Sequence, residues 1–292
     1  MTRKIILILT IYLIFIGISA NAQGYLKINN PVRLMTYNVR LDTPDDLENV
    51  WANRKARLIN VIKFNKAEIF CLQEPLPNQV NDLQQAFPEF GYYGVGREDG
   101  QNKGEFNPVF YDKRRFSVLE NGTFWLSETP EVAGSKGWYA TLPRIVTWLK
   151  MQDMMSGSSF YLFNTHFDHS SQNARDQSAI LLIAKVQEIA QGEPIIITGD
   201  FNDSPTSKPY KTIIENASGL ELKDAVTVSK YPHHGPSFTF VGFDFIGVPG
   251  RVIDYIFVNQ KIDVTWHATI TDNWDGVYPS DHLPVLIEFE IK

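Results

Sequence analysis

The sequence predicts an α/β protein whose two mixed sheets pack together and carry helices on their outer faces. Many segments are rich in Val, Ile and Phe and are separated by Gly, Asn, Asp and Pro, which is typical of strands. Fewer segments show the spacing of an amphipathic helix, and helices follow the first and the sixth expected strand. The remaining strands follow one another as in hairpins, so two packed sheets covered by helices are the simplest arrangement.

The expected elements occur in a definite order. Strands are predicted at 32–39, 68–74, 107–111, 116–126, 144–151, 160–166, 195–200, 237–240, 252–258, 264–270 and 283–291. Helices are predicted at 53–65, 79–87, 173–191 and 207–216. We find no internal repeat, low-complexity tract or long linker, so residues 23–292 are expected to form a single domain.

The two longer helices have an apolar stripe. In 173–191 this stripe comprises Ala179, Leu182, Ile183, Val186, Ile189 and Ala190. In 53–65 it comprises Leu58, Ile59 and Ile62. Asn173 is expected to be the N-cap of the later helix. Arg54 is expected to point outward from the earlier helix, together with Lys55 and Arg57.

The N-terminus has the pattern of a secretory signal peptide. Arg3 and Lys4 precede an apolar run at 5–18, and 19–22 is Ser-Ala-Asn-Ala, which contains an A-x-A cleavage site. We expect cleavage of 1–22 before Gln23 and export of the chain to a periplasm or out of the cell. The alternative is an uncleaved anchor, which the shortness of the run disfavours.

Charge and cysteine content narrow the function. The formal net charge of −6 becomes −8 once the two positive charges of Arg3 and Lys4 are removed. Non-specific binding of nucleic acid needs Lys and Arg to neutralise phosphates, so an acidic chain disfavours it. The only cysteine, Cys71, lies in an apolar strand and has no intramolecular disulfide partner. A core position is therefore expected for Cys71 rather than a nucleophilic role.

Polar side chains that suit metal and phosphate chemistry stand at the ends of several predicted strands. They are Asn38, Gln73, Glu74, Asn164, His166, Asp168, His169, Asp200, Asn202, Asp254, Asp281 and His282. Each one alone is compatible with a turn or a helix cap. Asp254 fits such a role less well, because it stands between Ile253 and Tyr255, where an isolated charge is costly to bury.

Four of these residues, Glu74, Asp200, Asp254 and Asp281, are carboxylates on or beside apolar strands. If they converge without a cation, their repulsion raises their pKa values and destabilises the fold. A divalent cation relieves that repulsion, and oxygen ligands from Asp, Glu and Asn suit Mg²⁺ or Mn²⁺. The zinc motifs HExxH and CxxC are absent.

Taken together and in this order, the motifs resemble the endonuclease/exonuclease/phosphatase superfamily, which has the fold of deoxyribonuclease I. The resemblance runs from Val32 to Ile291. The stretch FWLSETPEVAGSKGWYATLPRIVTW is similar to a secreted bacterial branch of that superfamily. The resemblance implies a four-layer α/β/β/α sandwich, which agrees with the layers expected from the order of the elements.

The resemblance also implies a metal and water site. Asn38 and Glu74 would hold the metal ion, Mg²⁺ or Mn²⁺, and Asp281 would lie close enough to join them. Asp200 would orient and deprotonate the attacking water, helped by Asn202. In-line attack on phosphorus needs such a water on one side and a metal ion at the developing charge.

Two histidine pairs complete the implied site. Asp254 would fix the tautomer and orientation of His282, which would bind the phosphoryl oxygens. His166 would stand opposite, on the phosphate or the leaving group. Glu105 matches the position whose carboxylate pairs with that second histidine in the nuclease branch, although many relatives have neither member of this pair.

Four further residues are weaker candidates for substrate binding. Asn164 belongs to the polar strand ends. Arg144 opens a strand and Arg175 lies in the first turn of a helix, where a cation opposes the helix dipole; an ordinary surface position is the alternative for both. Asp168 either lines the cleft or caps a turn.

The function predicted from these features is that of an exported, Mg²⁺- or Mn²⁺-dependent phosphoesterase. A phosphodiester is the first expectation, and a phosphomonoester of a sugar or inositol is the alternative. Nucleic acid, phospholipid headgroups and sugar or inositol phosphates remain as substrates, and a monomer without stable membrane insertion is expected. A non-catalytic binding module should have lost at least one site residue, and a serine hydrolase would need a G-x-S-x-G motif, which is absent.

Overall fold

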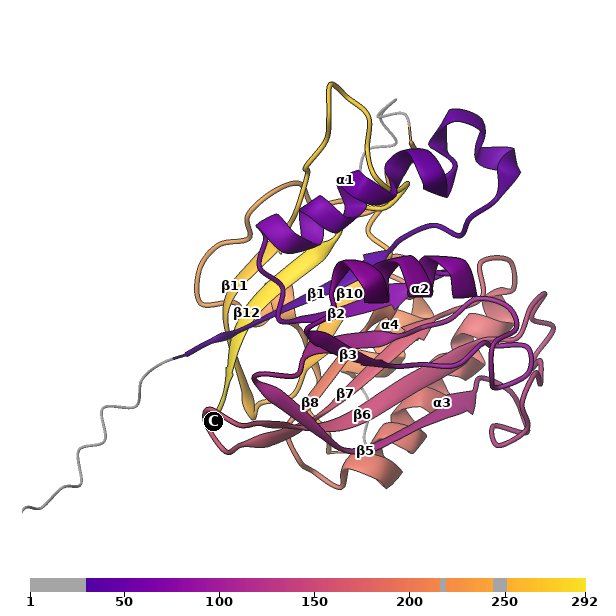
Figure 1. Ribbon diagram of the computed structural model, residues 1–292. Coiled ribbons are helices and arrows are strands. Elements are labelled where there is room, and N and C mark those ends of the chain that lie inside the picture. Colours follow the sequence, from indigo (N-terminus) through magenta and orange to yellow (C-terminus); the bar gives the residue numbers. More distant parts are fainter. Residues whose placement is uncertain (1–29, 216–218, 244–250) are drawn as a thin grey trace, which may run out of the picture.

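The strands form two six-stranded sheets that pack face to face (Figure 1). This computed structural model describes residues 30–215, 219–243 and 251–292. The expected signal peptide, 1–22, lies outside the described residues. Within the described ranges, no helix has the length and apolar character needed to cross a bilayer.

The first sheet, sheet 1, has the strand order β11-β12-β1-β2-β4-β3. Its strands are β1 (Val32–Asn38), β2 (Ile69–Gln73), β3 (Phe90–Tyr93), β4 (Val109–Asp112), β11 (Ile262–Thr269) and β12 (Val285–Ile291). β1 pairs parallel with β2, and the other neighbouring strands of this sheet are antiparallel. The parallel pair brings the C-terminal ends of β1 and β2 to one edge of the molecule.

The second sheet, sheet 2, has the order β5-β6-β7-β8-β10-β9. Its strands are β5 (Phe116–Trp125), β6 (Ile145–Asp153), β7 (Ser159–His166), β8 (Ile195–Asp200), β9 (Lys223–Asp224) and β10 (Asp254–Val258). β7 and β8 form the parallel pair here, and the remaining neighbours are antiparallel. Each sheet therefore has one parallel pair near its centre.

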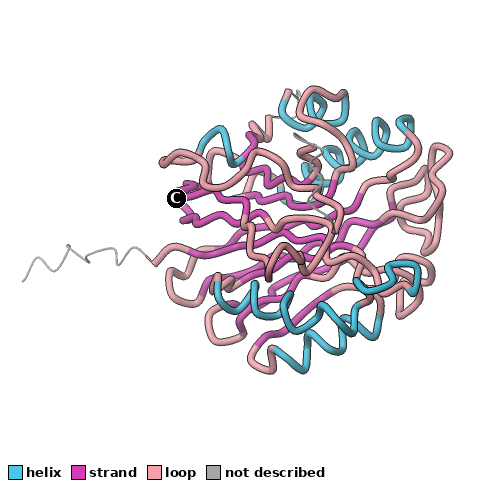
Figure 2. The backbone as a smooth tube through the Cα atoms, turned by 90° about the horizontal axis from the view of Figure 1, so that it is seen from above, coloured by secondary structure: helices cyan, strands magenta, loops and turns pink. Residues whose placement is uncertain are grey.

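Helices cover both outer faces, as the strand layers between cyan helices in Figure 2 show. α1 (Trp51–Phe64) and α2 (Pro77–Ala86) share an apolar core with sheet 1. α3 (Gln172–Ala190) and α4 (Lys208–Ile214) share one with sheet 2. A 3₁₀ segment, η1 (Pro44–Asn49), follows β1, and the short α5 (Ala225–Val228) follows β9.

A third apolar core lies between the two sheets and contains Leu34, Cys71, Leu162 and Ile196. Cys71 is fully buried, as predicted, and burial raises the pKa of its thiol to about 12. The arrangement is therefore helix, sheet, sheet, helix, which confirms the predicted four-layer α/β/β/α sandwich.

Several local predictions were wrong. Residues 237–240 are not a strand, and only Phe240 forms a bridge, with His282. The short β3 and β9 were not predicted, nor were η1 and α5. The N-cap of α3 is Ser171, whose hydroxyl accepts from the Ala174 amide at 3.2 Å, rather than Asn173. Arg54 points inward, with 1% of its surface exposed.

Candidate active site

The polar strand ends of the two sheets meet through Asn38. Its Nδ2 donates to Glu74 Oε1 at 2.9 Å and to Asp200 Oδ2 at 3.0 Å. Asn38 ends β1 and Glu74 follows β2, so both come from sheet 1, whereas Asp200 ends β8 of sheet 2. The site therefore lies at the edge where the two central parallel pairs end.

Asp200 is fixed by its neighbours in sheet 2. In the strand register it is paired with His166 of β7 on one side and with Asp254 of β10 on the other. The preceding residue must be glycine, because a Cβ on Gly199 would lie 2.2 Å from the carbonyl oxygen of Thr165. The strands thus bring two carboxylates and an imidazole together without help from a loop.

Asp254 and His282 form the first of the two histidine pairs that were predicted. His282 Nδ1 lies 2.9 Å from Asp254 Oδ2, and its Nε2 lies 3.7 Å from Asp200 Oδ2. Burial alone would lower the pKa of His282, but the Asp254 and Asp200 carboxylates outweigh burial and raise that pKa to about 10. His282 is therefore an imidazolium at neutral pH, and its Nε2 is directed to the Asp200 side of the site.

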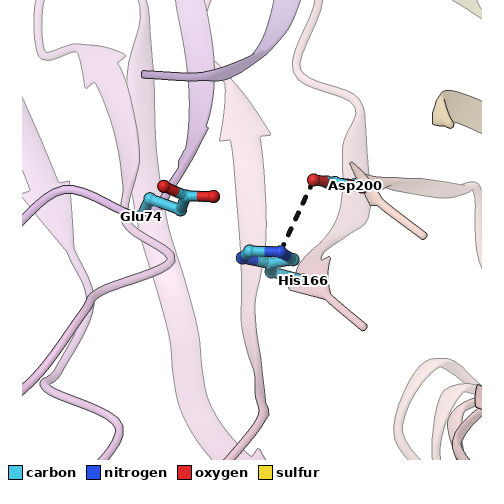
Figure 3. A group of neighbouring side chains, drawn as sticks. All are labelled: Glu74, His166 and Asp200. Atoms are coloured by element: carbon cyan, nitrogen blue, oxygen red, sulfur yellow. Dashed lines mark ion pairs between the residues drawn. The ribbon is translucent and has the colours of Figure 1, made fainter. Parts of the chain in front are cut away.

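His166 also contacts Asp200, as the dashed line in Figure 3 marks, and its Nε2 lies 3.4 Å from Asp200 Oδ2. The amide Nδ2 of Asn202 lies 3.0 Å from the same Nε2 and donates to the Phe167 carbonyl at 3.1 Å. Burial lowers the pKa of His166 well below its ordinary value, and the cations Arg144 and Arg97 lower it further. His166 is therefore neutral at neutral pH.

Glu105 stands next to His166 as the second pair requires, although the contact is loose. Its Oε2 lies 3.9 Å from His166 Nδ1 and 2.5 Å from Arg97 Nη1. Burial, together with the charge of Glu74, raises the pKa of Glu105 to about 7. Sequence reasoning missed Arg97; its position eight residues before Glu105 carried no strand-end signal.

The ligand atoms of the site fit a divalent cation. Glu74, His166 and Asp200 each offer one such atom, and these atoms lie within 4.8 Å of one another (Figure 3). Asp200, Asp254 and His282 form a second group of the same kind. Burial, together with the nearby Asp254, raises the pKa of Asp200 to about 7. A bound cation would lower the electrostatic cost of keeping this carboxylate charged. Carboxylate and amide oxygens suit a hard cation.

The geometry also shifts the predicted roles of some metal candidates. Asp281 belongs to neither group of three, so its role as a ligand stays a prediction. The Oδ1 of Asn38 accepts from the Arg40 amide at 3.0 Å, so it would offer a metal ion its remaining lone pair. His166, predicted to contact phosphate, is placed among the ligand atoms as well.

The structure contradicts the prediction that Asn164 binds substrate. Asn164 has no exposed surface. Its Nδ2 donates to the Leu72 and Pro108 carbonyls, and its Oδ1 accepts from Gln73 Nε2 at 2.7 Å and from the Thr198 hydroxyl at 3.2 Å. These bonds join the two sheets beneath the site and leave no atom for a substrate.

Asp168 and Arg175 also have structural partners instead of the predicted ones. Asp168 has no exposed surface, and it accepts from the amides of Ser170, Ser171 and Thr141. It is therefore a turn cap rather than a residue that lines the cleft.

The three guanidinium nitrogens of Arg175 bond to neighbours in the same loop region. The partners are Asp203 (3.1 Å), the Asp168 carbonyl (2.8 Å) and Gln172 (2.7 Å). The cation that opposes the dipole of α3 is thus held by a carboxylate of the adjacent loop. The structure does not support Arg175 as a phosphate contact.

Arg144 differs from these three. It has 3% of its surface exposed, and its Nη2 lies 2.9 Å from His169 Nδ1. Its Nε lies 3.6 Å from Asp168 Oδ2, and neither Nε nor Nη1 has a hydrogen-bond partner among the described residues. Its charge acts on His166 and Glu105, so Arg144 lies beside the site as a buried cation, and its role as a substrate contact stays a prediction.

Comparison with known proteins identifies the family. Residues 35–282 match the model of the Endonuclease/Exonuclease/phosphatase family. A solved endonuclease/exonuclease/phosphatase from Bacteroides vulgatus is 39% identical, with a TM-score of 0.84 over 90% of this chain and 100% of that chain. A mannosyl-6-phosphatase of Bacteroides thetaiotaomicron is 34% identical, with a TM-score of 0.84 over 89% of this chain and 100% of that chain.

Two curated relatives are more distant and longer. Human nocturnin is 26% identical over 266 residues, which covers 82% of this chain and 58% of nocturnin. An uncharacterised mimivirus protein is 24% identical over 86% of this chain and 42% of its own length. The chain thus spans less than two thirds of the length of these relatives.

The full-length matches have the same two-sheet sandwich, so the observed layers are those of the family. Proteins of this family hydrolyse phosphoesters, as the names of its phosphatase and nuclease members state. The strand ends that meet at Asn38 and Asp200 fall within the matched residues. The family match over residues 35–282 and the 39% sequence identity to a solved member show that the chain belongs to the endonuclease/exonuclease/phosphatase family.

Proposed function

We propose that the protein is a phosphoester hydrolase that uses Mg²⁺ or Mn²⁺ and in which Asp200 activates the attacking water. One observation carries this proposal. Asp200 lies within 4 Å of the three groups that the reaction needs: Asn38 at 3.0 Å, His166 at 3.4 Å and His282 at 3.7 Å. A base in that position can take a proton while donors on either side hold the phosphoryl group.

Each residue has a role that follows from its protonation state. Asp200 accepts the proton of the attacking water, and the Asn202 amide fixes His166 beside it. His282, kept protonated by Asp254 and Asp200, donates from Nε2 to a phosphoryl oxygen. Glu74 and Asn38 would hold the cation, with the Asp200 carboxylate next to them. When bound, a divalent cation supplies Lewis-acid stabilisation of the charge that develops on phosphoryl oxygens.

The leaving group needs a proton, and the second pair suits that task. The raised pKa of Glu105 allows this carboxyl to carry a proton near neutral pH. His166 is neutral and stands between Glu105 and the Asp200 side of the site. We infer that Glu105 supplies the proton that the leaving oxygen takes up, and that the neutral His166 beside it orients the leaving group.

For the substrate, a sugar phosphomonoester is the first candidate. The similarity to a mannosyl-6-phosphatase, at 34% identity over the whole of that chain, supports it and reverses the order expected from the sequence alone. A phosphodiester is the second candidate, because the Glu105–His166 contact resembles the pair of the nuclease branch. We further propose that the chain is exported, on the basis of the N-terminal pattern that ends before Gln23.

The experiment compares three substrates with the protein that begins at Gln23. Mannose 6-phosphate, p-nitrophenyl phosphate and bis(p-nitrophenyl) phosphate are assayed with Mg²⁺ or Mn²⁺ and with EDTA, beside Asp200→Ala. Cleavage that requires metal and is lost in Asp200→Ala supports the proposal, and the ratio of monoester to diester turnover decides between the candidates. Cleavage that persists in EDTA would refute it.

A further inference from the structure

Arg54 is a buried cation whose hydrogen bonds all go to backbone carbonyls. It lies in the first turn of α1 with 1% of its surface exposed, and no ion pair to it occurs among the described residues. Its acceptors are the carbonyls of Asn49 (2.8 Å), Val39 (2.5 Å), Pro279 (3.1 Å), Arg40 (2.6 Å) and Leu41 (3.3 Å). A guanidinium has five N–H donors, so every donor is used.

Packing alone does not account for a cation in this position. Trp51 and Phe243 flank the guanidinium, with ring centroids 5.2 and 5.6 Å from its Cζ; an apolar side chain would pack between these rings but would leave the carbonyls without donors. Burying a charge without a counter-ion is costly, and carbonyl dipoles offset that cost only when they are held in place. An apolar residue cannot donate hydrogen bonds to these carbonyls, whereas Arg54 does.

The peptide units held by Arg54 also hold the side chains of two metal candidates. The Arg40 amide donates to Asn38 Oδ1 at 3.0 Å, and the Leu41 amide donates to Glu74 Oε2 at 3.0 Å. In these same two peptide units, the carbonyls of Val39 and Arg40 accept hydrogen bonds from Arg54. The orientation of these amides, and with it the position of both side chains, therefore depends on the guanidinium.

Arg54 also ties this segment to the chain that leads into His282. It bonds the Pro279 carbonyl, and the next residue, Ser280, donates its hydroxyl to the Asn38 carbonyl at 2.7 Å. Asp281 and His282 follow directly. One side chain thus connects the end of β1 with the segment at Pro279, which lies 225 positions from Arg54 in the sequence.

We propose that Arg54 is a positioning residue of the metal centre, which holds Asn38 and Glu74 in the geometry that binds the cation. The inference rests on the proposed metal dependence. A lysine in its place keeps the charge but has three donors on one nitrogen, and it cannot span carbonyls that lie on three separate chain segments. Charge alone is therefore insufficient for this role.

The test measures Mn²⁺ binding directly, by calorimetric titration of the wild-type protein and of Arg54→Lys and Arg54→Met. Folding of each variant is checked by circular dichroism. Arg57→Met is the matched control, because Arg57 lies one turn further along α1 and is partly exposed. We expect the Kd for Mn²⁺ to rise about tenfold or more in Arg54→Lys and further in Arg54→Met, and to stay within about twofold in Arg57→Met.

The outcomes separate this inference from the proposed function. A wild-type protein that binds no Mn²⁺ refutes the metal dependence itself. A folded Arg54→Lys that binds Mn²⁺ as tightly as wild type overturns the role of Arg54. If neither variant folds, hydrogen exchange on the wild-type protein decides: slower exchange of the Arg40 and Leu41 amides on adding Mn²⁺ supports the inference, and unchanged exchange overturns it.

Discussion

The two sheets fix their site residues in different ways. In sheet 2 the strand register itself aligns Asp200 with His166 and Asp254, so backbone hydrogen bonds determine their spacing. In sheet 1 the side chains of Asn38 and Glu74 are held by amides of the segment after β1. Sheet 2 therefore fixes its acid–base groups through its own strands, whereas the proposed metal ligands of sheet 1 depend on a segment outside the sheet.

Positive φ angles occur where the chain leaves the strands of both sheets, since Asn202, which follows β8 of sheet 2, has φ 51°. Glu74 has φ 74° and Arg40 has φ 56°, both in the left-handed region that side chains other than glycine seldom adopt. Such residues persist when surrounding contacts determine them, and they concentrate at functional sites. In sheet 1 the conformation of Arg40 is held by Arg54, which bonds the Val39 and Arg40 carbonyls on either side of it. Changes in sheet 2 should then alter chemistry, and changes near sheet 1 should alter metal affinity.

The largest effect is expected for Asp200→Asn, which keeps the shape of the side chain and removes the base. We expect kcat/KM to fall about 10³- to 10⁴-fold, with no recovery at high Mn²⁺. Asp203→Asn is the control, because Asp203 lies in the same loop region but bonds to Arg175 and Gln172. Recovery of Asp200→Asn by excess Mn²⁺ would make Asp200 mainly a ligand rather than a base.

A smaller, recoverable effect is expected for Glu74→Gln. The amide keeps its bond from Leu41 but loses the charge that attracts a cation. At limiting Mn²⁺ we expect activity to fall about 100-fold, and saturating Mn²⁺ should restore most of it. Mn²⁺ titrations of activity measure this. A loss that no Mn²⁺ concentration reverses would show that Glu74 takes part in the chemical step.

The next effect depends on pH and concerns Asp254→Asn. The carboxylates of Asp254 and Asp200 raise the pKa of His282 to about 10, so the imidazolium persists at alkaline pH and is lost as pH rises through that value. Without the Asp254 charge, that loss should begin at lower pH. We expect activity about 30-fold lower at neutral pH and an alkaline limb shifted down by at least about one unit.

Profiles of rate against pH for the wild-type protein and Asp254→Asn give the measurement. The shift must be towards lower pH, because removing a negative charge destabilises the protonated histidine. A variant with lower activity but an unchanged alkaline limb would show that Asp254 serves only to orient the ring.

The pattern of polar residues at the ends of apolar strands explains both the correct site predictions and the wrong one. It located Asn38, Glu74, Asp200 and Asp254, because a polar side chain at the end of an apolar strand is costly to bury unless it has a polar partner there. The same pattern included Asn164, which shares one face of β7 with His166 but lies two residues deeper, between the sheets. The periodicity of a strand predicts which face a side chain points to, but it does not predict whether that position is exposed to solvent.

Arg54 shows a second limit of sequence reasoning. An arginine next to Lys55 in an amphipathic helix has the pattern of a solvated face, and its true partners are backbone carbonyls from other segments. Every residue type carries a carbonyl, so no composition or spacing signals these partners. Such contacts become visible only when the fold brings the segments together.

The smallest effect on activity is expected where the two sheets are joined, in Asn164→Leu. The change removes bonds to Gln73, Leu72, Pro108 and Thr198 and leaves buried polar groups without partners. We expect the free energy of unfolding to fall by about 3 kcal/mol, whereas KM changes less than about twofold, because no atom of Asn164 is exposed.

Thr165→Val is the control for that prediction, since its hydroxyl makes a single bond, to the Ile145 carbonyl at 3.0 Å, and its loss should cost about 1 kcal/mol. Denaturant unfolding and steady-state kinetics measure the two quantities on the same samples. A large rise in KM with unchanged stability would return Asn164 to the substrate site. The expected result instead shows that Asn164 holds the two sheets together, and with them the site residues of sheet 2 next to Asn38 and Glu74 of sheet 1.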